Sequence, residues 1–327
     1  MKNFKPLTLA LTIVVLLLCA SVSFAENPQS VTQLMIRGDD QLKNKQYDDA
    51  ISTYSQVIKL APTNSTAYHG RGYSRLKKSD YALAIDDFTM AIKYDPQFFF
   101  AYLDRGQAYY LLQKYDLSLA DLEVAIRLNP ASPAPYFGRG NVYVTQAKYD
   151  LAIKDFTKLI EIAPIPTSYF YRADAYFRAK EYNLALDDVN QALEKDSKNT
   201  RGYTLRTYIN TELKNYDQVV SDCSFLLEQN PESVSARITR SNVYGLMGQY
   251  DDAITDCQEA IQLAPKNLMA HFNLAEAYEF KGDKDAALKE YQIANSLFPS
   301  DPKKYVPERR KCQARLNGDW DSSKDWI

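Results

Sequence analysis

Apolar and polar residues alternate along this chain with the spacing of amphipathic helices that come in pairs. Residues 136–156, "YFGRGNVYVTQAKYDLAIKDF", contain one such pair. Apolar residues recur there every three or four positions, which predicts a helix, a short polar break and a second helix. Arg139 interrupts the pattern, because it lies on the expected buried face between Tyr136 and Tyr143, where a leucine would fit.

The same pattern recurs with a period of 34 residues, and only the fourth copy is one residue short. Eight copies begin at Val31, Ser65, Phe99, Pro133, Pro166, Thr200, Val234 and Leu268. Counted from these starts, position 8 is small throughout, position 20 is alanine in six copies, and position 32 is proline in seven. Small residues let two helices approach closely, and proline ends the second helix. Each copy is therefore expected to fold as a helix hairpin.

These repeats resemble the tetratricopeptide repeat family, in which small, aromatic and proline residues recur at the same positions. The resemblance implies an all-α fold, a right-handed superhelical solenoid of eight helix-turn-helix repeats. We expect the array to occupy 26–301. A polar segment, 302–316, is predicted to be a C-terminal capping helix, and 317–327 is predicted to be a flexible tail.

Arg139 belongs to a row of arginines at position 7, and acidic residues form a second row at position 23. Six repeats carry both residues, for example Arg139 with Asp155. Pairing within a repeat gives six complete pairs, whereas pairing each aspartate with the next repeat's arginine gives five. We therefore favour ion pairs within each repeat, with the arginine stems laid on the core. The alternative, an open arginine row for anionic ligands, is disfavoured because the acidic row would cancel its field.

Residues 1–25 have the composition of a secretory signal peptide. Lys2 and Lys5 precede an uncharged run, and "SFA" at 23–25 offers a cleavage site. This predicts a periplasmic or secreted protein. An uncleaved segment acting as a membrane anchor is the alternative. Cys223 and Cys257 occupy equivalent positions of neighbouring repeats, about 10 Å apart in a stacked array, which is too far for a disulfide.

Charge and composition narrow the function. The formal net charge is -2 and no basic patch stands out, so nucleic acid is not an expected partner. Only two histidines, His69 and His271, are present and they lie far apart in the array, so neither a metal site nor a histidine-based catalytic site is predicted. We expect no enzyme activity, no cofactor and no small-molecule substrate.

The resemblance implies that positions 2, 5, 9 and 12 of each first helix line a concave face on which peptide ligands lie. The groove candidates are His69, Tyr73, Leu103, Gln107, Tyr110, Phe137, Asn141, Phe170, Asp174 and Phe177. Later repeats are more polar there, with Thr204, Glu276 and Glu279 among the residues. We expect a partner's apolar side chain to bind beside the shortened fourth repeat, near Phe170, and Thr204 to matter little.

Together these features predict a non-enzymatic scaffold or adaptor that binds a protein or peptide outside the cytoplasm. A membrane-anchored factor for envelope assembly or secretion is the alternative. It would contact a membrane only if the signal stays uncleaved.

Overall fold

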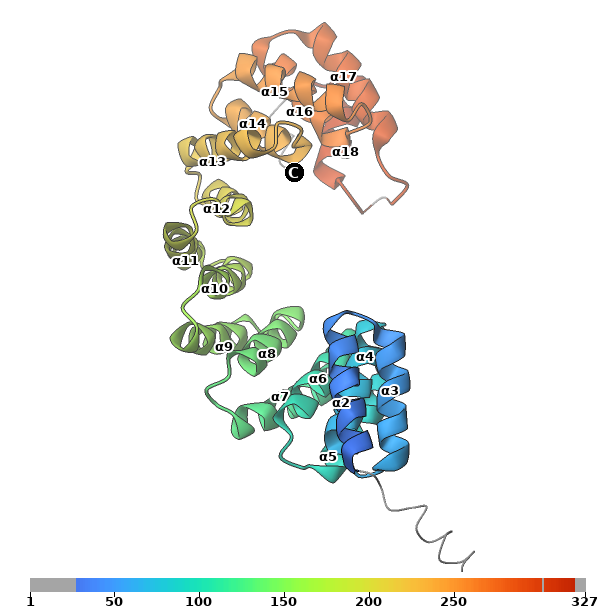
Figure 1. The fold of residues 1–327 in the computed structure, drawn as a ribbon. Helices are drawn as coiled ribbons and strands as arrows, with labels where there is room; N and C mark the ends of the chain where they lie inside the picture. Colours follow the sequence, from blue (N-terminus) through green and yellow to red (C-terminus); the bar gives the residue numbers. More distant parts are fainter. Residues whose placement is uncertain (1–27, 302, 321–327) are drawn as a thin grey trace, which may run out of the picture. The chain divides into compact units, whose positions relative to one another are not determined.

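The computed structural model describes residues 28–301 and 303–320. This part of the chain contains seventeen α-helices and no strand, which confirms the all-α class. The predicted signal, residues 1–25, lies outside the described residues. Sixteen helices of the described residues form eight consecutive hairpins, and within each of the two units defined below neighbouring hairpins stack in a solenoid-like arrangement. One further helix follows them (Figure 1).

Each hairpin joins an even-numbered first helix to an odd-numbered second helix. In order they are α2 (Pro28–Lys43) with α3 (Tyr47–Leu60), α4 (Ser65–Lys77) with α5 (Tyr81–Tyr94), α6 (Phe99–Leu111) with α7 (Tyr115–Leu128), α8 (Pro133–Thr145) with α9 (Tyr149–Ile162), α10 (Pro166–Arg178) with α11 (Tyr182–Lys195), α12 (Thr200–Glu212) with α13 (Tyr216–Gln229), α14 (Val234–Leu246) with α15 (Tyr250–Leu263), and α16 (Leu268–Lys281) with α17 (Lys284–Leu297). From α4 onward, every first helix begins at the residue that the repeat places at position 1.

The turn inside each hairpin contains one residue with a left-handed backbone, always at position 15. Two of the eight are glycines, Gly248 (φ 76°) and Gly282 (φ 93°). The other six are Lys45, Ser79, Gln113, Ala147, Lys180 and Lys214, with φ between 56° and 68°. A side chain makes this conformation costly, so six turns hold strain that the hairpin packing must offset.

The core of each hairpin forms where a small residue of the first helix meets a large residue of the second. A Cβ added to Gly140 would lie 2.5 Å from the Phe156 ring, and one added to Gly72 would lie 2.8 Å from the Phe88 ring. The repeat pattern predicts that the small residues at positions 8 and 20 face each other across the hairpin. Position 20 is indeed buried, as at Ala152 (0% exposed), but at Gly140 and Gly72 the ring at position 24 fills the space over the glycine.

The chain divides into two compact units, residues 1–162 and 163–327. We call them unit 1 and unit 2. The division falls between Ile162, where α9 ends, and Pro166, where α10 begins, which is the segment shortened by one residue. The two prolines of "IAPIPTSYF" lie in or beside this connection. An altered stacking angle at this point stays a prediction.

The last helix, α18 (Val306–Leu316), packs in unit 2 against α17. Cys312 is fully buried in a cluster with Phe272, Ala287 and Tyr291. Trp320, which lies in the segment that the sequence predicts as a flexible tail, also packs against this cluster. Within the described residues, no helix combines the length and the apolar character needed to cross a bilayer.

Candidate functional site

The arginine and aspartate rows form a ladder of ion pairs inside the hairpins. Arg139 donates from Nε to Asp155 Oδ2 (2.9 Å) and from Nη2 to Asp155 Oδ1 (2.7 Å). The same two-point contact joins residues 16 apart in all six repeats that carry both residues: Arg71–Asp87, Arg105–Asp121, Arg139–Asp155, Arg172–Asp188, Arg206–Asp222 and Arg240–Asp256. The predicted pairing within each repeat is confirmed.

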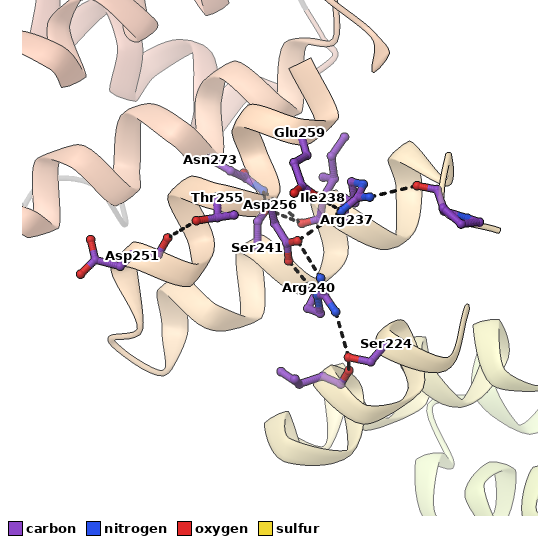
Figure 2. A network of polar contacts seen from close by, with 12 residues as sticks. Ser224, Arg237, Ile238, Arg240, Ser241, Asp251, Thr255, Asp256, Glu259 and Asn273 are labelled. Carbon is purple, nitrogen blue, oxygen red and sulfur yellow. Dashed lines mark hydrogen bonds and ion pairs between the residues drawn. The ribbon is translucent and has the colours of Figure 1, made fainter. Parts of the chain in front are cut away.

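Several ladder arginines also contact the preceding repeat. Arg240 Nη1 donates to Ser224 Oγ of α13 (2.9 Å), as Figure 2 shows. Arg71, Arg105 and Arg206 make the equivalent contact to Ser55, Thr89 and Asn190. Each of these guanidinium groups therefore joins two helices of its own repeat to the second helix of the repeat before it. This contact was not predicted, although polar residues at position 25 were visible in the sequence.

The ladder leaves little of the arginine row open to a ligand. The Asp155 side chain is 5% exposed and the Arg139 side chain 21%. Hydrogen bonds to Asp155 raise the pKa of Arg139, and Asp256 does the same for Arg240. Charge-assisted, two-point contacts of this kind are among the stronger polar contacts in proteins. The arginine row is a structural element of the hairpins, as expected, and the functional side chains must be sought elsewhere.

The first-helix face, formed by positions 2, 5, 9 and 12 of the first helices, carries all ten groove candidates. In unit 1 these are His69 and Tyr73 on α4, Leu103, Gln107 and Tyr110 on α6, and Phe137 and Asn141 on α8. Gln107 is exposed and the other six are half-buried. In unit 2 they are Phe170, Asp174 and Phe177, all on α10.

Two of the unit 1 candidates join neighbouring repeats to each other. His69 Nε2 lies 2.7 Å from Asp104 Oδ2 on α6, and its ring lies 4.9 Å from the Phe98 ring. The hydroxyl of Tyr110 lies 3.2 Å from that of Thr145 on α8. His69 and Tyr110 therefore each use a hydrogen-bonding group for a contact inside unit 1, and that group is not left open for a ligand.

Phe170 lies in the core of unit 2 and forms part of a pocket floor. It is 4% exposed and clusters with Ala173, Val189 and Ile209. One edge of it borders a pocket of about 390 Å³ between α10 and α12, which Asp174 and Phe177 also line. The structure thus brings the three unit 2 candidates together around one hollow.

Sequence reasoning missed several residues of this pocket. Arg178, Leu205 and Tyr208 complete its lining together with Arg201 and Thr204. Tyr208 is 50% exposed and stands at position 9 of its repeat, the same position as Tyr73 and Asp174. The repeat register alone could therefore have identified it.

A second pocket of about 270 Å³ lies between α12, α13 and α14, and Thr204 and Tyr208 line both pockets. Thr204 therefore lies between the two pockets, and its small expected contribution to binding stays a prediction. Small side chains, including Ser235 and Thr239, leave the space that forms the second pocket.

The sequence places Glu276 and Glu279 on the polar part of the first-helix face, and both carboxylates are paired with side chains of the capping helix. Lys311 Nζ of α18 lies 2.8 Å from Glu276 Oε1, and Arg315 Nε donates to Glu279 Oε1 (2.9 Å). The Arg315 side chain is fully buried. The capping helix therefore covers these carboxylates, as a further first helix would, and the first-helix face is occupied at this end of unit 2.

The described residues offer few candidates for a nucleophile or a metal site. Cys223, Cys257 and Cys312 are free and buried, and burial raises the pKa of each thiol to about 12, so they are poor nucleophiles. No group of three or more His, Cys, Asp or Glu side chains among residues 28–301 and 303–320 is placed to hold a metal ion.

Comparison with known proteins agrees with the repeat pattern. Family models described as "Tetratricopeptide repeat" match residues 37–97, 137–200 and 246–304, and a model described as "TPR repeat" matches residues 106–147. Together they span more than half of the chain. A search of curated proteins found no match.

Many solved structures have a similar fold. The C-terminal part of a TPR repeat-containing protein from Cytophaga hutchinsonii is 18% identical with a TM-score of 0.56, covering 86% of this chain and 99% of its own. A tetratricopeptide repeat protein from Parabacteroides merdae is 16% identical with a TM-score of 0.55, covering 77% and 97%. YrrB, described as "a TPR protein with an unusual peptide-binding site", is 21% identical with a TM-score of 0.50, covering 56% and 95%. At these identities the likeness concerns the fold alone.

Proposed function

Because the chain belongs to the tetratricopeptide repeat family, we propose that it is a protein-binding scaffold that holds a peptide segment of its partner against the first-helix face. The observation that carries this proposal is the pocket of about 390 Å³ lined by Phe170, Asp174 and Phe177. Three residues chosen for their repeat positions converge there on one hollow with an apolar floor. Such a hollow suits an anchoring side chain.

A binding role without catalysis fits the chemistry of this face. His69 is engaged with Asp104, and Asp174 with Arg178, so these titratable groups are held in pairs. General acid–base catalysis needs a group placed to exchange a proton with a substrate. YrrB, which shares the fold, is described as having a peptide-binding site, and that supports a peptide as the ligand.

Site-specific photo-crosslinking tests the binding face. A photoreactive amino acid at Tyr208, which is 50% exposed on α12, is expected to capture a protein partner in the source cell. The matched control is the same amino acid at Leu184, which is 44% exposed on the second helix α11. Adducts that form only from Leu184, or equally from both positions, would contradict binding at the first-helix face.

We also propose that the scaffold acts outside the cytoplasm, because residues 1–25 have the composition of a secretory signal. Cell fractionation followed by N-terminal sequencing of the native protein tests this. A mature chain beginning near Glu26 in the extracytoplasmic fraction is the expected result. An intact N-terminus in the membrane fraction would favour the alternative, an anchored assembly or secretion factor. An intact N-terminus in the cytoplasmic fraction would contradict both.

A further inference from the structure

The two pockets of unit 2 are neighbours on one continuous surface. We call them the apolar pocket, between α10 and α12, and the hydroxyl pocket, between α12, α13 and α14. Thr204 and Tyr208 line both, so the two pockets share these two side chains of α12. Successive first helices lie about 10 Å apart. An extended peptide rises about 3.3 Å per residue, so side chains about three residues apart would reach the two pockets.

The apolar pocket combines an apolar floor with a cation that lacks an anionic partner. Phe170 and Leu205 form part of the floor. Asp174 and Arg178 at the rim pair with each other (2.8 Å), so their charges offset. Arg201 is exposed, and its guanidinium carbon lies 5.9 Å from the centre of the Tyr171 ring. No carboxylate of the described residues pairs with Arg201, which leaves the rim with one uncompensated positive charge.

The hydroxyl pocket has a different character. Its lining contains hydroxyl and amide side chains but no Lys, Arg, His, Asp or Glu. Thr204 and Thr207 already donate their hydroxyl protons to backbone oxygens of Thr200 and Tyr203 (2.9 and 2.8 Å). Their oxygens remain able to accept, so the pocket favours a ligand group that donates a hydrogen bond. A charged side chain would lose hydration there without gaining a counter-charge.

From these features we infer that the two pockets bind an extended peptide with three recognisable groups, an inference that rests on the peptide-binding function proposed above. A bulky apolar side chain enters the apolar pocket. An adjacent acidic residue pairs with Arg201. A serine, threonine or asparagine about three residues away enters the hydroxyl pocket. Charge complementarity selects this occupant, because a basic segment would meet the uncompensated charge of Arg201 and find no acid in the hydroxyl pocket.

Selection from a random library of displayed dodecapeptides on the immobilised full-length chain tests the inference. The enriched peptides are expected to share an apolar residue next to Asp or Glu, with Ser, Thr or Asn about three positions away. For one selected peptide, Arg201→Gln is expected to weaken binding about tenfold and to remove the acidic preference, whereas Arg201→Lys retains most of it. Thr239→Val keeps the side-chain shape, removes one hydroxyl of the hydroxyl pocket, and is expected to relax the preference at that peptide position only.

Leu184→Ala, on the second helix α11 and 44% exposed, is the control and is expected to leave this binding unchanged. Peptides that bind with no acidic preference, or that lose binding in Leu184→Ala but not in Arg201→Gln, would overturn the inference and leave a peptide-binding scaffold in place. If the chain selects no peptide at all, the inference and the proposed peptide-binding function both fail. Unchanged unfolding midpoints of the Arg201 and Thr239 variants exclude loss of folding as the cause.

Discussion

The two units share one repeat pattern but use the first-helix face differently. In unit 1, His69 at position 5 of α4 reaches Asp104 at position 6 of α6 (2.7 Å). In unit 2 the same two positions on α12 and α14 hold Thr204 and Thr239, and both residues line the hydroxyl pocket. At positions 5 and 6 of successive first helices, the large polar pair His69 and Asp104 bridges two repeats, whereas the smaller pair Thr204 and Thr239 leaves a hollow. The number of aromatic residues on a helix therefore says little about where a groove is open.

Phe170 gives the largest expected effect, because it belongs to the core of unit 2. Phe170→Ala should remove a 4% exposed ring from its cluster and lower the free energy of unfolding by about 3 to 5 kcal/mol. Tyr208→Ala, on the same pocket but 50% exposed, should change it by about 0.5 kcal/mol or less. Denaturant unfolding measures both. Equal effects would mean that Phe170 is a surface anchor, as its position in the repeat suggested.

The ladder should contribute equally in both units, since its geometry is the same. Arg139→Met in unit 1 and Arg172→Met in unit 2 each remove the arginine that pairs with a buried aspartate, which should cost about 3 kcal/mol. Adding Asp155→Leu to the first variant should restore much of the loss, because an absent carboxylate is better than an unpaired buried one. Unfolding midpoints of the single and double variants measure this. Costs that simply add in the double variant would contradict the pairing.

The sequence alone predicted some of these features and not others. It predicted the hairpins and the ladder, because both depend on contacts within a repeat that recur in register, such as Arg139 with Asp155. It identified Phe170, Asp174 and Phe177, which line the apolar pocket, but it did not identify the hydroxyl pocket. That feature depends on how much space remains between neighbouring repeats, as at Thr204 and Thr239, and periodicity does not reveal it. The sequence predicted a capping helix over 302–316, but it did not predict that Arg315 of this helix pairs with Glu279.

The contrast between bridged and open positions can be measured directly. In unit 1, a double-mutant cycle of His69→Leu and Asp104→Leu should show a coupling energy of about 1 kcal/mol, because a charge-assisted contact is lost. The equivalent cycle in unit 2, Thr204→Val with Thr239→Val, should show additive effects within about 0.5 kcal/mol. Similar coupling in both cycles would erase the distinction between the two units.

The smallest expected effect concerns the turns, where reverse exchanges in the two units should shift the stability in opposite directions by similar amounts. Ala147 in unit 1 and Gly248 in unit 2 both have a left-handed backbone, with φ of 56° and 76°. In this conformation a residue with a side chain costs about 1 to 2 kcal/mol of stability. Glycine has the opposing disadvantage of about 0.4 to 1 kcal/mol relative to alanine, because it gives the unfolded chain more conformational freedom. The net difference is about 0.5 kcal/mol in favour of glycine.

Ala147→Gly should therefore stabilise the protein by about 0.5 kcal/mol, and Gly248→Ala should destabilise it by a similar amount. A Cβ on Gly248 would meet nothing closer than the Tyr250 hydroxyl at 4.0 Å, so crowding does not add to the second effect. Thermal unfolding of the two variants against the parent chain measures the pair. Opposite shifts of similar size would show that the units share one hairpin frame and differ in the side chains of the first-helix face. Shifts of the same sign would mean that the turns of the two units are held differently, and that the contrast between them extends into the backbone.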